Sequence, residues 1–211
     1  MDAVTRGPRP PGTADSLVDR CKAAAGALAR ALCRALCICS LVAASTAAYP
    51  ADVDRGVERA VKAAYLYKFL NYADWPDKAF ADAHAPYVIG VHGADDIVLE
   101  LTKLVSARPV ADRPVQVRKV ARGESLDGLH VLFIGAGAAN PAGMLAQSAQ
   151  QGSLLVVTES DRAAGAGAAI NLLVVDGRVR FDVFLDAAER AGIRLSSRLL
   201  AVARNVRNGA E

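Results

Sequence analysis

The sequence predicts an α/β fold, in which a single domain holds a mixed sheet with parallel crossovers, a C-terminal β-hairpin and helices on both faces. Three observations indicate it: a helical apolar periodicity at the start of the domain, two strand-then-helix units in its middle, and a two-residue turn between two strands near its end. Of the 211 residues, 53% are hydrophobic and 22% are charged. That composition supplies a core and excludes a disordered chain.

Residues 1–48 have the composition of a signal peptide with an N-terminal extension, which leaves residues 49–211 as the domain. Arg30 and Arg34 precede fourteen uncharged residues, a run shorter than the roughly 20 apolar residues that span a bilayer. The run ends in small residues, so we expect cleavage near residues 47–49 and a periplasmic product. An uncleaved membrane anchor is the alternative.

The cysteines all belong to this first segment. A metal site is one interpretation of such a cluster, and thiols in a leader that is removed are the other. With the leader removed, the domain has no cysteine, so it can use neither a disulfide nor a thiol even in an oxidising compartment. The four residues are Cys21, Cys33, Cys37 and Cys39.

The domain begins with a predicted helix over residues 53–72, which Pro76 ends. A β-rich run at 87–92 follows, and then a second helix with Asp95 as its expected N-cap. The first helix repeats apolar residues every three or four positions on one expected face. That face comprises Val57, Val61, Tyr65, Phe69 and Tyr72.

The sequence of the middle of the domain predicts three strands. Pro114 before the alternating run at 115–118 suggests a strand at the sheet edge. The apolar run at 130–134 is followed by Asn140 and Pro141, a cap and first-turn pair, which open a helix that should end near Gly152 before the strand at 154–158. Strand, helix and strand in about 30 residues predict a parallel crossover.

The end of the domain predicts a hairpin and two helices. Strands at 170–175 and 179–183 flank Asp176-Gly177, a strong two-residue hairpin signal. Apolar residues alternate in the second strand with Arg178, Arg180 and Asp182, which should lie on its polar face. A short helix at 186–191 follows. Ser196 or Ser197 should then cap a final helix. Its expected buried stripe is Leu199, Leu200, Ala203 and Val206.

The charge balance argues against nucleic-acid binding. The chain has 25 Lys and Arg against 22 Asp and Glu, but the excess lies in residues 1–48, and nineteen of each sign remain from Tyr49 onward. No arginine stripe alternates with aromatic residues, so a phosphate-backbone binder is a poor interpretation.

An enzymatic site is predicted to be absent. Gly135 and Gly137 follow a strand and open a helix, and Glu159 ends the next strand, which is nearly the dinucleotide-binding pattern. The third glycine of that pattern is replaced by Asn140. A glycine-rich turn is therefore the preferred interpretation, without a cofactor. The histidines, His84, His92 and His130, have no partner at metal-ligand spacing, so no metal site is predicted.

Two sets of residues are candidates for binding. Six of the eleven aromatic residues lie within residues 65–80, and Tyr72, Trp75 and Pro76 at the helix end could anchor a protein partner, the alternative being that the rings face the core. Arg180, Arg194 and Arg198, with Arg178, could hold an anionic ligand. The alternative for the arginines is a solvated face paired with Asp182 and Glu189.

The chain resembles the YfiR family of exported bacterial proteins. The resemblance rests on KAAYLYKFLNYADWP, HVLFIG and the block INLLVVDGRVRFDVFLDAAERAGIRLSSRLLAVARNV, and it covers about residues 60–206. Matching positions include Asn171, Phe181, Ala187, Ser197, Leu199 and Leu200. Leu129 stands where relatives often have a cysteine, so disulfide-based control is not implied.

The resemblance implies a function. Members are periplasmic, non-catalytic α/β proteins that tend to form homodimers, and the best-understood ones repress a membrane-bound diguanylate cyclase by binding its periplasmic sensor region, which lowers cyclic-di-GMP and restrains biofilm formation. We therefore expect a periplasmic repressor of this kind. The alternative is a periplasmic sensor of an anionic small molecule that serves a different membrane signalling partner.

Overall fold

The structure, a computed structural model, describes residues 50–106, 108–161 and 166–208. The predicted signal peptide lies outside these ranges, so its cleavage stays a prediction. None of the helices in the described ranges is long and apolar enough to cross a membrane. The secondary structure, in chain order, is α2 (Pro50–Tyr72), β1 (Ala73–Asp74), the 3-10 helix η1 (Asp77–Ala79), β2 (Tyr87–His92), α3 (Asp95–Val105), β3 (Val115–Lys119), β4 (Val131–Ile134), α4 (Pro141–Ser148), β5 (Leu155–Thr158), β6 (Ile170–Val175), β7 (Arg178–Phe184), α5 (Leu185–Arg190), β8 (Arg194–Leu195), α6 (Ser197–Val202) and β9 (Asn205–Arg207).

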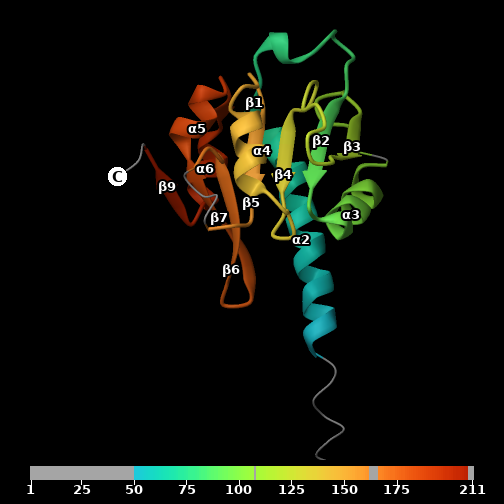
Figure 1. The fold of residues 1–211 in the computed structure, drawn as a ribbon, viewed down its shortest axis with the longest axis vertical. Helices are drawn as coiled ribbons and strands as arrows, with labels where there is room; N and C mark the ends of the chain where they lie inside the picture. Colours follow the sequence, from blue (N-terminus) through green and yellow to red (C-terminus); the bar gives the residue numbers. More distant parts are fainter. Residues whose placement is uncertain (1–49, 107, 162–165, 209–211) are drawn as a thin grey trace, which may run out of the picture. The chain divides into compact units, whose positions relative to one another are not determined.

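The described strands form a seven-stranded mixed sheet with the order β3-β2-β4-β5-β6-β7-β9 (Figure 1). A separate two-stranded sheet pairs β1 with β8. Neighbours from β3 to β6 are parallel, β6 and β7 are antiparallel, and β9 is parallel to β7. The predicted α/β fold with its crossovers is confirmed. The strand β3, which Pro114 precedes, lies at the sheet edge as predicted.

The predicted hairpin is confirmed by its turn. Asp176 and Gly177 both have positive φ angles, of 49° and 69°, as a two-residue hairpin turn requires. Beyond the first two residues of β6 no pairing with β5 continues, and β9 pairs only with Asp182–Phe184 of β7. The turn end of the hairpin therefore extends past the neighbouring strands (Figure 1).

Each face of the sheet has its own apolar core. One core joins the sheet to α2, α3, α5 and α6, with Leu66, Phe69, Leu101 and Phe181 among its most buried residues. The other lies under α4, where Met144 and Leu145 pack on alternate residues of the same strands. Helices on both faces are thus confirmed, and the alternation of strand residues between the two faces explains why the central strands are almost uniformly apolar.

The predicted buried face of α2 is only partly right. The residues of α2 that are most buried are Ala63, Leu66, Phe69 and Leu70. Val57 is 58% exposed, and Tyr65 and Tyr72 are half-buried at the edge of the core. Phe69 is thus buried as predicted, but the buried face is centred on Ala63, Leu66 and Leu70, so it is rotated by part of a turn from the predicted one.

Helix boundaries also differ from the prediction. Asp95 is not the N-cap of α3, because Ala94 occupies that position; Asp95 instead lies in the first turn and pairs with Lys119 at 2.6 Å. The α4 helix ends at Ser148 rather than near Gly152, whereas its predicted cap is confirmed: the Asn140 side chain accepts the Gly143 N–H.

The predicted final helix is too long. Ser196 caps α6 by accepting the Leu199 N–H, but the helix ends at Val202 and the chain continues as β9. Val206 is therefore 42% exposed on a strand rather than buried on a helix. The backbone N–H of Arg204 donates to the Phe181 carbonyl at 2.8 Å, which draws this segment onto the edge of β7.

Candidate functional site

The connections of the parallel strands diverge between β2 and β4. From β2 the chain crosses through α3 to β3 on one side, and it then returns to β4 on the other side of β2. In open α/β sheets such a switch point leaves a crevice outside the carboxyl ends of the strands, where ligands commonly bind. We call this end of the sheet the carboxyl edge.

The glycines of the predicted dinucleotide motif are used for packing at the carboxyl edge. A Cβ added to Gly135 would lie 2.6 Å from the Ala94 Cβ, and one added to Gly137 would lie 2.8 Å from the Gly93 carbonyl oxygen. Gly93 itself has φ of 72° and lies against the Ala138 backbone. These glycines let the loops after β2 and β4 touch, which favours the glycine-rich turn over the cofactor site.

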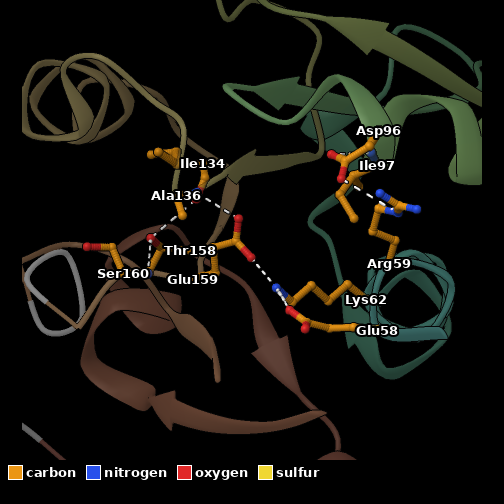
Figure 2. A network of polar contacts seen from close by, with 10 residues as sticks. All are labelled: Glu58, Arg59, Lys62, Asp96, Ile97, Ile134, Ala136, Thr158, Glu159 and Ser160. Carbon is orange, nitrogen blue, oxygen red and sulfur yellow. Dashed lines mark hydrogen bonds and ion pairs between the residues drawn. The ribbon is translucent and has the colours of Figure 1, made fainter. Parts of the chain in front are cut away.

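The third residue of that motif, Glu159, is held by the protein itself. Its carboxylate accepts the Ala136 N–H at 2.7 Å and pairs with the ammonium of Lys62 from α2, which also pairs with Glu58 at 2.5 Å (Figure 2). The side chains of Lys62 and Glu159 are only 11% and 13% exposed. In a dinucleotide site a loop N–H of this kind would face a phosphate, and here a carboxylate of the same chain takes that place.

The charge on Lys62 is stabilised by its partners. Burial lowers the pKa of the ammonium, but the hydrogen bonds to Glu159 and Glu58 and the negative charges of these carboxylates together outweigh burial, and the pKa lies above its usual value. The ammonium therefore stays charged at neutral pH and fastens α2 to the carboxyl edge.

A cavity of about 140 Å³ opens beside this network. At its outer side Arg59 and Asp96 form a loose ion pair, with 3.8 Å between Arg59 Nε and Asp96 Oδ2, and both side chains are substantially exposed (Figure 2). The cavity is lined by Arg55, Glu58, Arg59, Lys62, Asp96, Ile97 and Glu159.

The opposite end of the sheet, which we call the amino edge, carries an aromatic cluster. The Trp75 ring meets Tyr87 edge-on at 5.4 Å between centroids, and Phe80 stacks on His130 at 4.5 Å. The Arg113 guanidinium lies 3.9 Å from the centre of the Phe80 ring. Trp75 Nε1 is buried without a hydrogen-bond partner among the described atoms.

His130 is buried in this cluster in its neutral form. Its Nδ1 accepts the Val88 N–H at 3.2 Å, so the proton of the neutral ring is on Nε2. Burial lowers the pKa of His130, the backbone carbonyl of Ala79 offsets part of this, and the charge of Arg113 lowers it further, so that the net shift is downward.

The predicted partner-contact residues lie at the amino edge. Tyr72, Trp75 and Pro76 are each partly exposed, and Trp75 is packed against the rings of the cluster rather than standing free. A second cavity has a volume of about 310 Å³, and the first residue in the chain that lines it is Lys78. It is lined by Lys78, Ala79, Leu126, Gly128, Leu129, Gln151, Gly152 and Ser153.

The predicted ligand-binding arginines come from three elements. Arg180 is on β7, Arg194 on β8 and Arg198 in α6, all with exposed side chains, and neither cavity is lined by any of them. Their convergence on an anion stays a prediction. The small sheet brings Arg194 close to the predicted partner-contact residues. In the register of β1 and β8, Arg194 lies opposite Asp74, which is between Tyr72 and Trp75 in the sequence.

The arginine that binds a buried carboxylate is one that sequence reasoning missed. Asp182, which alternation placed on the wet face of the hairpin, is 4% exposed, and Arg204 binds both of its oxygens, with Nε at 2.8 Å from Oδ1. Asn205 donates to the same carboxylate at 3.1 Å. The described residues contain no group of three or more His, Cys, Asp or Glu that could hold a metal ion.

The structure is an α/β domain with a charged cavity at one end of the sheet and an aromatic cluster at the other. The sequence profile of the YfiR/HmsC-like family matches residues 59–204, so the chain belongs to that family. The match includes Lys62, Trp75, Glu159 and Arg204. At the level of the family, YfiR-like proteins are periplasmic regulators of diguanylate cyclase signalling rather than enzymes. Comparison with individually curated proteins gives no match.

Proposed function

We propose that this protein represses a membrane-bound diguanylate cyclase by binding its periplasmic sensor region, and thereby lowers cyclic-di-GMP and restrains biofilm formation. The observation that carries the proposal is membership of the YfiR/HmsC-like family across residues 59–204, which is most of the domain. The protein acts by binding to the cyclase and performs no catalysis. It is exported, and its leader is cleaved near residues 47–49.

The partner contacts the amino edge around Tyr72, Trp75 and Pro76. The 310 Å³ cavity supports this placement, because it is lined by Lys78 and Ala79, which follow Pro76 closely in the chain, and a hollow near a contact surface can receive a partner's side chain. Arg194 lies next to these residues across the small sheet. Its exposed guanidinium can add a charged contact at the rim, where charges contribute mainly to association rate and specificity.

Deletion of the gene in the native host tests repression. We expect cyclic-di-GMP and surface-attached growth to rise, and a plasmid copy with an intact leader to restore both. Periplasmic cross-linking to the plasmid-borne protein should capture a membrane protein that contains a cyclase domain. Unchanged cyclic-di-GMP in the deletion strain would contradict the proposed function.

Charge reversal tests the contact surface without disturbing the core. Arg194→Glu should weaken binding to the captured partner about tenfold and raise cyclic-di-GMP in the complemented strain, because Arg194 is exposed on β8 opposite Asp74, the residue before Trp75. Arg122→Glu, a change at an exposed arginine after β3, is the matched control. Equal effects of the two variants would place the contact elsewhere.

The family tendency to dimerise supports a homodimer for this chain. Light scattering on the purified protein between micromolar and hundred-micromolar concentrations should give twice the monomer mass. A mass that stays monomeric over this range would rule the homodimer out as the working form.

A further inference from the structure

We propose that the carboxyl-edge cavity binds a small zwitterion, a molecule whose carboxylate and ammonium lie a few bonds apart as in a short-chain α-amino acid. The proposal goes beyond cyclase repression, since it concerns a second site at the opposite end of the sheet. It rests on three features of the cavity: its position, its two layers of charge and its size.

The position is the one where open α/β sheets hold their ligands. The lining residues come from α2, from the start of α3 after β2, and from the residue that follows β5. They therefore surround the carboxyl ends of the strands at the point where the connections diverge. The cavity at the amino edge has no such relation to the topology.

The inner layer of charge is already satisfied. Lys62 binds both Glu58 and Glu159, and the second oxygen of Glu159 accepts the Ala136 N–H. A ligand that reached these groups would have to displace a shielded ion pair, which is unfavourable. The inner layer thus forms a fixed polar floor, and the loop N–H that could have bound a phosphate is occupied.

The outer layer is available to a ligand. Arg59 and Asp96 are 3.8 Å apart, longer than a charge-assisted hydrogen bond, and their side chains are 39% and 51% exposed. Arg55 lines the same cavity. A carboxylate can insert between the two guanidinium groups while an ammonium meets Asp96, so that each member of the loose pair gains a closer partner.

The sum of charges and the volume select the ligand. Three cationic and three anionic side chains line the cavity, so a ligand without net charge leaves the balance unchanged, whereas a simple anion or cation disturbs it. The volume of about 140 Å³ suits a molecule of several heavy atoms. Ile97 is the one apolar lining residue, which gives an aromatic or long aliphatic side chain little to pack against.

Thermal melts and calorimetry on the purified full chain test the proposal with L-alanine and L-serine as probes. Propionate and ethylamine are the matched controls, because each keeps one charged end of alanine and lacks the other. At ten times its Kd, either amino acid should raise Tm by roughly 3 °C or more, while the controls raise it less than a third as much. No shift with either amino acid up to 20 mM, or an equal shift with propionate, would overturn the proposal.

Variants then locate the binding. Arg59→Gln and Asp96→Asn should each weaken amino-acid binding at least tenfold, and both should fold, because their side chains are exposed. Arg190→Gln removes a similar surface ion pair, with Asp186 at 2.7 Å, away from the cavity and should leave Kd unchanged. Unchanged Kd in both cavity variants would overturn the proposed site. The assay contains no cyclase, so its outcome is independent of that of the proposed function.

Discussion

The two edges of the sheet differ in the groups that hold them together. At the carboxyl edge every buried charge has a partner: Lys62 has two carboxylates, and Glu159 has an ammonium and a backbone N–H. At the amino edge, rings surround polar atoms that are poorly satisfied, and Trp75 Nε1 and His130 Nε2 have no hydrogen-bond partner among the described atoms. Unpartnered buried atoms are not confined to that end, since His92 Nε2 at the carboxyl end of β2 has no partner among the described atoms either. The comparison teaches that one sheet can be fastened by ion pairs at one end and by packed rings at the other.

The largest expected effect comes from breaking the paired end. Lys62→Ala should lower the free energy of unfolding by about 3 to 5 kcal/mol, because it leaves Glu159 shielded without its cation. Urea unfolding at pH 7.5 measures this. Lys103→Ala, which breaks an exposed pair with Glu100, should cost less than about 1 kcal/mol. A double variant, Lys62→Met with Glu159→Leu, should recover most of the loss in the free energy of unfolding. If it does not, the ion pair stabilises the fold by more than the cost of burying its two charges.

The next effect concerns the aromatic end. Trp75→Ala should destabilise the protein by about 3 kcal/mol, because it leaves a cavity against Tyr87 and His130. Trp75→Phe should cost much less, since it keeps a ring and removes an N–H that has no partner. The two melts separate the explanations. If Phe is as damaging as Ala, the N–H makes an interaction that the protein requires.

A smaller effect tests the backbone contact between the loops at the carboxyl edge. Gly135→Ala should cost about 2 kcal/mol, because its Cβ would lie 2.6 Å from Ala94 Cβ and 2.8 Å from the Gly93 carbonyl. Gly152→Ala, where nothing lies within 4 Å, is the control and should be nearly neutral. A neutral Gly135→Ala would show that the loops can separate without loss.

The smallest effect sharpens the comparison through pH. His130 has a lowered pKa in the folded protein, so the unfolded chain binds more protons below about pH 6.5, and the contribution of His130 to stability should fall as pH decreases from 7.5 to 5.5. In His130→Gln this part of the pH dependence should disappear. Lys62, whose pKa is raised, loses its contribution only at strongly alkaline pH. An unchanged slope in His130→Gln would assign the acid sensitivity to other groups.

The order of elements could be predicted because its signals are local. Asp176-Gly177, the Asn140 cap and Pro114 at the sheet edge each act within a few residues, and each was confirmed. The ion pair between Lys62 and Glu159 could not be predicted in the same way, because the two residues are separated by 97 positions and no spacing rule joins them. The motif of Gly135, Gly137 and Glu159 lies at the carboxyl edge, where its residues serve packing and ion pairing.

The C-terminal strand was missed for a related reason. The apolar residues after Ser196 fit a helix as well as a short helix followed by a strand, and the choice depends on Asp182, which belongs to another strand. Alternation along the hairpin placed Asp182 in solvent. Only the three-dimensional contact with Arg204 and Asn205 shows it to be buried.

The contact of Asp182 with Arg204 and Asn205 helps to hold β9 on the edge of β7, where it hinders edge-to-edge aggregation. The three-residue strand β9 occupies part of the open side of β7, whose backbone would otherwise offer unpaired N–H and C=O groups to a neighbouring chain. A chain shortened before Arg204 would leave the buried Asp182 carboxylate without its cation. The same truncation would expose the unpaired backbone groups of β7. The main effect of this truncation would then be aggregation during export rather than a slightly lower melting temperature.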